Sequence, residues 1–142
     1  MHAVRFLDTN ILLYAYDLDA PLKRAVALGI VEEGWCSLGE TAISVQVLQE
    51  LHVNMERKGI AKEEIHAVVQ DFSMWPIVEN TLPLLHAGMA EKSRWHLSLW
   101  DAMILAAARA CGAKELISED FSNGQDYDGI LIINPFEKSA PR

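Results

Sequence analysis

The chain has 142 residues, of which 51% are hydrophobic and 23% charged, and its formal net charge is −8 at pH 7. This length and composition exclude a disordered chain, and we expect a single domain over residues 1–142. The acidic excess counts against nucleic-acid binding, which usually requires a basic face. That objection weakens if divalent cations neutralise a local cluster of carboxylates.

Targeting and redox signals predict a cytoplasmic protein. The apolar run 11–16 is bracketed by Asp8 and Asp17 and is too short for a signal peptide. No apolar run approaches the roughly 20 residues that cross a membrane, so we expect no membrane partner. Cys36 and Cys111 form no CxxC pair, which argues against a structural zinc site and suits a reducing compartment.

The first third of the chain predicts two strands and two helices. An apolar run at 4–7 predicts the first strand, and a helix is expected over 10–16. Pro21 suits the first turn of a second helix, which we expect to stop near Gly34. A short second strand is expected at 40–43.

The middle third predicts three helices and one strand. Ser44 is the expected N-cap of a helix over 45–58, where apolar residues recur at helical spacing. Further helices are expected at 62–72 and 82–95. Between them, the segment 74–78 predicts a strand, and Pro76 places that strand near an edge of the sheet.

The last third predicts one buried helix and two strands. After Ser98 the sequence is apolar nearly all round until Gly112, a pattern typical of a helix packed closely on a sheet. Strands are expected at 116–118 and 130–133. Strands separated by helices along the whole chain predict an α/β fold, with a mainly parallel sheet and helices on both faces.

Four acids have apolar neighbours, where a solvated carboxylate is not expected. Asp8 and Asp120 each follow an apolar strand. Asp101 opens the buried helix, and Glu50 flanks the apolar stripe of its own helix. Taken singly, each has a structural explanation. Asp8 suits a helix cap, and Asp101 suits a capping box whose N-cap is Ser98. Glu50 suits a solvated surface, and Asp120 suits a turn.

Taken together, the four acids predict a divalent-metal site. The carboxyl ends of parallel strands share one rim of a sheet, so we expect these side chains to converge there. Like charges that close destabilise a fold unless cations compensate them. Mg²⁺ and Mn²⁺ prefer carboxylate and water ligands, and they support phosphodiester hydrolysis without a catalytic His or Cys.

The segments that carry these acids resemble the PIN domain family, and within it the VapC-type toxins of bacterial toxin–antitoxin pairs. Five segments, in order over nearly the whole chain, carry the resemblance: Asp8-Thr9-Asn10, 44–50, 100–108, 116–120 and Asn134-Pro135-Phe136. The resemblance implies a three-layer α/β/α sandwich and an Mg²⁺- or Mn²⁺-dependent endoribonuclease that acts as a toxin on RNA. It also implies a cognate antitoxin and a homodimer.

The resemblance further implies roles for individual residues. The metal-ligating and catalytic acids would be Asp8, Glu50, Asp101 and Asp120. Supporting or water-orienting residues would be Thr9, Asn10 and Ser118. Whether one or two ions bind stays open. So does the choice between Glu119 and Asp120 as the metal-facing acid, although the family's pattern favours Asp120.

Substrate contacts are less defined. The segment 92–96 combines Lys92 and Arg94 with Trp95, a mixture that suits RNA. We prefer the explanation that these cations complement the carboxyl end of a helix. The tryptophans at positions 35, 75 and 100 are expected in the core rather than on RNA.

Three other functions fit part of the pattern. A PIN-like scaffold that binds RNA or protein without cleaving it differs from the nuclease only in an assay. A receiver-type signalling domain shares an acidic pocket but requires a lysine at the end of a late strand, where 118–120 reads Ser-Glu-Asp. A haloacid-dehalogenase-type phosphatase requires a second acid where Asn10 stands.

Overall fold

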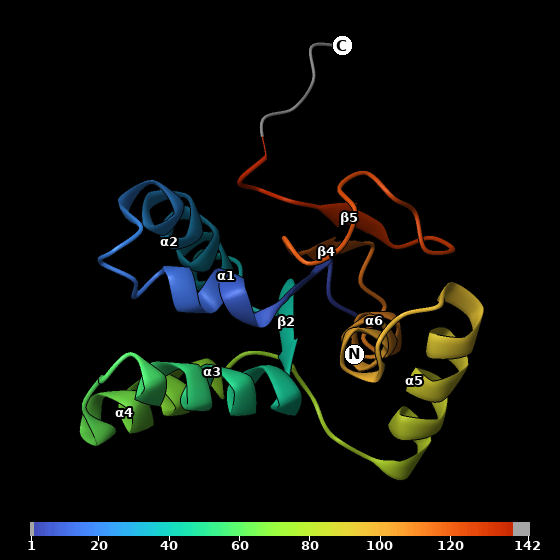
Figure 1. Ribbon diagram of the computed structural model, residues 1–142, viewed down its shortest axis with the longest axis horizontal. Coiled ribbons are helices and arrows are strands. Elements are labelled where there is room, and N and C mark those ends of the chain that lie inside the picture. Colours follow the sequence, from blue (N-terminus) through green and yellow to red (C-terminus); the bar gives the residue numbers. More distant parts are fainter. Residues whose placement is uncertain (1, 138–142) are drawn as a thin grey trace.

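The computed structural model describes residues 2–137 and is built around one five-stranded sheet (Figure 1). The strands are β1 (Arg5–Leu7), β2 (Thr41–Ser44), β3 (Ile77–Val78), β4 (Glu115–Ile117) and β5 (Leu131–Ile133). Their order is β3-β2-β1-β4-β5, and all four neighbouring pairs are parallel. The predicted parallel sheet is therefore confirmed, and β3 lies at its edge, as Pro76 indicated.

Within residues 2–137, six helices cover the two faces of this sheet. They are α1 (Thr9–Tyr14), α2 (Pro21–Cys36), α3 (Val45–Arg57), α4 (Lys62–Phe72), α5 (Leu82–Trp95) and α6 (Leu99–Ala110). Figure 1 shows α5 and α6 on one side of the strands and α1 to α4 on the other, so the predicted three-layer α/β/α architecture is confirmed. Within residues 2–137, no helix has the length and apolar character needed to cross a bilayer.

Two of the boundaries that differ from the prediction lie beside the aromatic ring of Trp75. Helix α2 continues past Gly34 to Cys36. A Cβ atom added to Gly34 would lie 2.7 Å from two ring atoms of Trp75, so this glycine permits close packing instead of ending the helix. Trp75 is buried in a turn that ends α4, and strand pairing begins only at Ile77.

Serine caps start the two helices that carry predicted acids. The Ser44 hydroxyl accepts a hydrogen bond from the Val47 N–H at the start of α3 (3.2 Å). The Ser98 hydroxyl accepts one from the Asp101 N–H at the start of α6 (3.1 Å). Helix α6 is buried from Ala102 to Ala108, as its composition predicted. The caps fix where each helix begins, and so they fix the positions of the acids.

One tryptophan lies outside the core, contrary to expectation. Trp75 is buried, and Trp35 packs against it and against Phe72. Trp100, in contrast, is 68% exposed. It stands in the first turn of α6, ahead of the buried stretch of that helix, so its apolar ring predicted a burial that its position does not provide.

Candidate functional site

The order of the strands defines where a site is expected. From β1 the chain moves outward to β2 and β3 and then returns to β4, on the other side of β1. In open α/β sheets, ligands bind beyond the carboxyl ends of the strands at such a reversal. Asp8 directly follows β1, and Ser118 to Asp120 directly follow β4. Both predicted strand-end acids therefore lie at the reversal point.

Asp8 is at the centre of this rim. Its side chain is only 5% exposed, and each of its carboxylate oxygens accepts a hydrogen bond. Oδ1 accepts from the Thr9 N–H (2.8 Å), which makes Asp8 the N-cap of α1. Oδ2 accepts from the Ser118 hydroxyl (2.7 Å). The capping role and a place among the acids thus coexist in one carboxylate.

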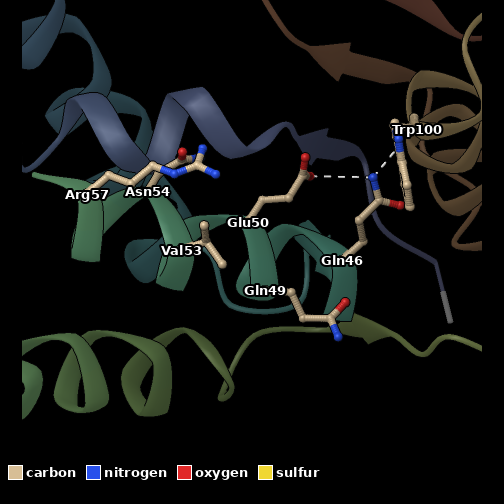
Figure 2. Close-up of a pocket in the computed structure, with 7 residues that line it drawn as sticks. All are labelled: Gln46, Gln49, Glu50, Val53, Asn54, Arg57 and Trp100. Atoms are coloured by element: carbon tan, nitrogen blue, oxygen red, sulfur yellow. Dashed lines mark hydrogen bonds between the residues drawn. The ribbon is translucent and has the colours of Figure 1, made fainter.

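A second acid joins from α3. The Thr9 hydroxyl donates to Oε1 of Glu50 (2.9 Å), which links the start of α1 to the middle of α3. Gln46 Nε2 donates to the same Glu50 oxygen (3.4 Å) and to the Trp100 backbone carbonyl (3.2 Å), as Figure 2 shows. Gln46 was not predicted, although its place four residues before Glu50 on one helix was the available signal.

The third acid is held by the residues that follow β4. The Asp120 N–H donates to the Ser118 hydroxyl (3.0 Å), the same group that donates to Asp8. Asn10 Nδ2 contacts Oδ2 of Asp120 (3.4 Å). Thr9, Asn10 and Ser118 therefore each contact at least one predicted acid. Together they join Glu50, Asp8 and Asp120 in one continuous hydrogen-bonded network.

Glu119 is occupied elsewhere. The Tyr14 hydroxyl donates to its Oε1 (2.6 Å), and Lys23 Nζ pairs with its Oε2 (2.9 Å). Lys23 also donates to the Tyr14 hydroxyl (3.1 Å). The two carboxylate oxygens of Glu119 are thus engaged by α1 and α2. Its neighbour Asp120 stays with the network of Asp8. Sequence reasoning missed Tyr14 and Lys23, whose link to Glu119 spans about 100 residues.

Asp101 interacts with the site electrostatically and makes no hydrogen bond to it. It lies in the first turn of α6, and among residues 2–137 its side chain has no hydrogen-bond partner in the network. Its charge nevertheless helps to raise the pKa of Asp120, after the larger effect of burial. Asp8, Glu50 and Asp120 are therefore linked by hydrogen bonds, whereas Asp101 is linked to them only through its charge.

Burial and mutual repulsion disfavour the charged form of Asp8. The pKa of Asp8 is raised from 3.8 to about 7; desolvation by burial is the largest cause, and the charges of Asp120 and Glu50 contribute to the rise. The hydrogen bonds from Ser118 and Thr9 lower the pKa but do not offset the burial. A carboxylate held in this way gains from a nearby cation.

The donor set suits a hard cation that keeps part of its water. All the acids supply oxygen, the donor that Mg²⁺ and Mn²⁺ prefer. In the described part of the chain, no three Asp, Glu, His or Cys residues group closely enough to hold an ion by themselves. Mg²⁺ commonly binds through one or two carboxylates plus waters, so these residues fit that mode rather than an all-protein cage.

Comparisons with known proteins identify a family model and solved structures with a similar fold. The model of the PIN domain family matches residues 5–122. A toxin–antitoxin complex from Klebsiella pneumoniae is 25% identical, with a TM-score of 0.66 over 94% of this chain and 99% of that chain. DNA-bound VapBC from Salmonella typhimurium is 25% identical, with a TM-score of 0.60 over 92% and 96% of the two chains.

A more distant likeness shows the fold alone. VapC20 from Mycobacterium tuberculosis, a toxin that cleaves the sarcin–ricin loop, is 19% identical, with a TM-score of 0.61. The match covers 79% of this chain and 86% of that one. No curated protein matches the sequence.

Proposed function

This chain belongs to the PIN domain family, and on that premise we propose that it is a divalent-metal-dependent endoribonuclease, the toxin of a toxin–antitoxin pair. The observation that carries the proposal is the hydrogen-bonded network of Asp8, Glu50 and Asp120 at the reversal point of the sheet. A buried carboxylate at Asp8, with Glu50 and Asp120 linked to it, favours metal-assisted phosphodiester hydrolysis.

The proposed nuclease would use a bound divalent cation. Nucleases of this family generally use a divalent metal. Here Asp8, Glu50, Asp101 and Asp120 would hold Mg²⁺ or Mn²⁺ between them, some directly and the others through waters bound to the ion. When bound, the cation supplies positive charge beside the scissile phosphate.

The supporting residues orient the carboxylates before any ion arrives. Thr9 and Ser118 each donate to one oxygen of Asp8, which fixes the rotation of that carboxylate. Thr9 and Gln46 both donate to Oε1 of Glu50, and Oε2 accepts no hydrogen bond from residues 2–137. Oε2 is therefore the oxygen available for a ligand. This preorganisation limits the reorganisation that binding requires.

Substitution of the acids tests the proposal. We expect both Asp8→Asn and Asp101→Asn to keep the fold, because asparagine can also cap α1 at position 8 and the Asp101 side chain makes no hydrogen bond in the network. Both should abolish Mg²⁺- or Mn²⁺-dependent cleavage of total RNA and growth inhibition on expression. Asp128→Asn is the matched control, since it removes the same charge from an exposed residue paired with Arg94. A folded Asp8→Asn protein that cleaves RNA at the wild-type rate would refute the metal-site proposal.

A catalytically silent PIN-like scaffold is the second proposal. It is favoured by the absence, within residues 2–137, of three acids grouped closely enough to hold an ion unaided. Titrating Mg²⁺ and Mn²⁺ against cleavage of an RNA pool separates the two. A scaffold stays inactive at every metal concentration but still binds RNA or protein.

Partners follow from the same premise. Two similar structures are a toxin–antitoxin complex and a VapBC complex, and we propose that this chain also has a cognate antitoxin. We further propose that it forms a homodimer, that residues 1–142 form one domain, and that the protein is cytoplasmic. The net charge of −8 suits a partner with basic side chains. A small upstream reading frame whose product has a DNA-binding amino terminus and copurifies with the chain would support the pairing.

A further inference from the structure

A pocket of about 380 Å³ opens beside Glu50, along the exposed face of α3 (Figure 2). Trp100 of α6 lines one part of it. The other lining residues come from α3: Gln46, Gln49, Glu50, Val53, Asn54 and Arg57. We call this pocket the α3 groove. From Gln46 to Arg57 the helix extends about 16 Å at 1.5 Å per residue, so the groove is longer than one nucleobase.

The polar lining of the groove consists mainly of amides. The NH₂ group of Gln46 already donates hydrogen bonds to Glu50 and to the Trp100 backbone carbonyl. The Gln49 carbonyl oxygen accepts from Asn80 (3.3 Å), which leaves the NH₂ group of Gln49 as a donor. Within residues 2–137 the Asn54 side chain has no hydrogen-bond partner. Amide groups with spare donors and acceptors suit the edges of nucleobases.

Trp100 supplies an aromatic surface at the groove. A tryptophan that is 68% exposed loses most of the benefit of burying its ring, so a folding role does not account for it. Gln46 holds the backbone carbonyl of this residue (3.2 Å), which fixes the first turn of α6 against α3. An exposed ring on a fixed backbone is suited to stacking with an unpaired base.

Arg57 supplies positive charge. Arg5, Arg94 and Arg109 each form a salt bridge, whereas Arg57 forms none with any residue in the described range. Its position in the last turn of α3 complements the helix dipole, but that effect does not require it to line the groove. Glu50 is the only acid in the lining, and it already accepts two hydrogen bonds. The Arg57 guanidinium is therefore available to a phosphate.

We propose that the α3 groove binds a single-stranded part of the RNA substrate next to the bond that is cleaved. One base stacks on Trp100, and one backbone phosphate contacts Arg57. The strand must be single, because only unpaired bases expose a face for stacking and an edge for the amides. The inference rests on the proposed ribonuclease function, since the groove contains Glu50 of the proposed site.

Binding is measured separately from cleavage. The Asp8→Asn protein is titrated, in Mg²⁺, against a fluorescein-labelled single-stranded RNA 10-mer of mixed sequence and against the matching duplex, with fluorescence anisotropy as the readout. In this background we expect Trp100→Ala to weaken single-strand binding about tenfold and Trp100→Phe to keep most of the affinity. The duplex is expected to bind more weakly than the single strand.

The salt dependence isolates the phosphate contact. Arg57→Gln is expected to reduce the slope of log K against log salt concentration by about 0.7, the value for one phosphate on a single strand. Lys114→Gln is the matched control. It removes the same charge from an exposed residue just before β4, at the opposite end of the strands from the site, and is expected to leave the slope unchanged.

The outcomes separate the groove from the function. If Asp8→Asn binds RNA but neither Trp100→Ala nor Arg57→Gln alters binding, the groove inference is wrong and the ribonuclease proposal stands. If Trp100→Ala leaves RNA binding intact but changes the mass in sedimentation, the groove is a contact between copies of the chain. If it leaves RNA binding intact but abolishes binding of the antitoxin, the groove serves that protein. A wild-type protein that neither binds nor cleaves RNA refutes both proposals.

Discussion

Asp8 combines two roles that usually belong to different residues. One oxygen caps α1, and the other accepts a hydrogen bond from Ser118 on the far side of the reversal point. Locally, the sequence around Asp8 predicts a cap, and that prediction is confirmed. The raised pKa of Asp8 appears only in three dimensions, because burial and the nearby charges of Asp120 and Glu50 cause it.

The pKa of Asp8 predicts how the stability of the metal-free protein depends on pH. Folding raises this pKa from 3.8 to about 7, so the folded state holds the proton more strongly than the unfolded state. The free energy of unfolding should therefore fall as the pH rises from about 4 to about 7 and then level off. The total fall corresponds to about 1.4 kcal/mol for each unit of pKa shift. Thermal unfolding in EDTA across this range measures it.

Two comparisons complete that experiment. Asp8→Asn lacks the titrating group, so the fall should be smaller in this variant. Adding Mn²⁺ should stabilise the wild-type protein more at pH 8 than at pH 5, because the cation competes with the proton for the same carboxylate. An identical pH dependence in wild type and Asp8→Asn would show that Asp8 does not cause the fall.

At the scale of helices and strands, the sequence predicts what depends on neighbours along the chain. Ser44 and Ser98 identified the starts of α3 and α6, and Pro76 identified an edge strand. Features that depend on residues far away in the sequence were either not predicted or predicted wrongly. Gly34 looked like a helix end because its contact, the ring of Trp75, is 41 residues away.

The site shows the same division. Its four acids stand out in the sequence because each adjoins an apolar element. Thr9, Asn10 and Ser118 each lie within two residues of one of these acids. How closely the acids group is set by packing, which spacing along the chain does not report. The pairing of Lys23 with Glu119 and the exposure of Trp100 likewise depend on tertiary contacts.

The packing of α5 on α6 provides a prediction at this scale. A Cβ atom added to Gly88 of α5 would overlap the sulfur of Met103 on α6. Overpacking costs about 1–3 kcal/mol, and the helix preference of alanine offsets about 1 kcal/mol of it, so Gly88→Ala should be less stable than Gly29→Ala. Gly29→Ala is the control, because a Cβ atom there meets nothing within 4 Å and alanine favours the helix. Urea unfolding of both variants decides, and equal stabilities would contradict the packing argument.

At the scale of the whole molecule, the surface carries charge and apolar area in different places. The net charge of −8 favours solubility and basic partners. Helix α5 nevertheless exposes Leu82, Leu85 and Met89, which recur at spacings of three and four residues and so share one face. Exposed apolar residues on one helix face suit a protein contact, and we propose this face as the interface of the proposed homodimer.

A charge placed in this stripe tests the assignment. Met89→Glu should shift the protein from dimer to monomer at micromolar concentration, because a carboxylate would lose its hydration in the interface. Met74→Glu adds the same charge at a residue that is 75% exposed just after α4, and it should leave the mass unchanged. Analytical ultracentrifugation of the two variants gives the answer. A Met89→Glu protein that stays dimeric would move the interface elsewhere.

The connection between β3 and α5 also divides the residues of the proposed active site between two halves of the chain. Asp8 and Glu50 come before this crossing, and Asp101 and Asp120 come after it. The halves meet along the seam where β1 pairs with β4. Neither half has all four acids, so two fragments separated between β3 and α5 would each lack two of the proposed ligands. The proposed nuclease activity would then require both fragments to associate, so the loop at 79–81 is the place at which to split the chain into a conditional two-part enzyme.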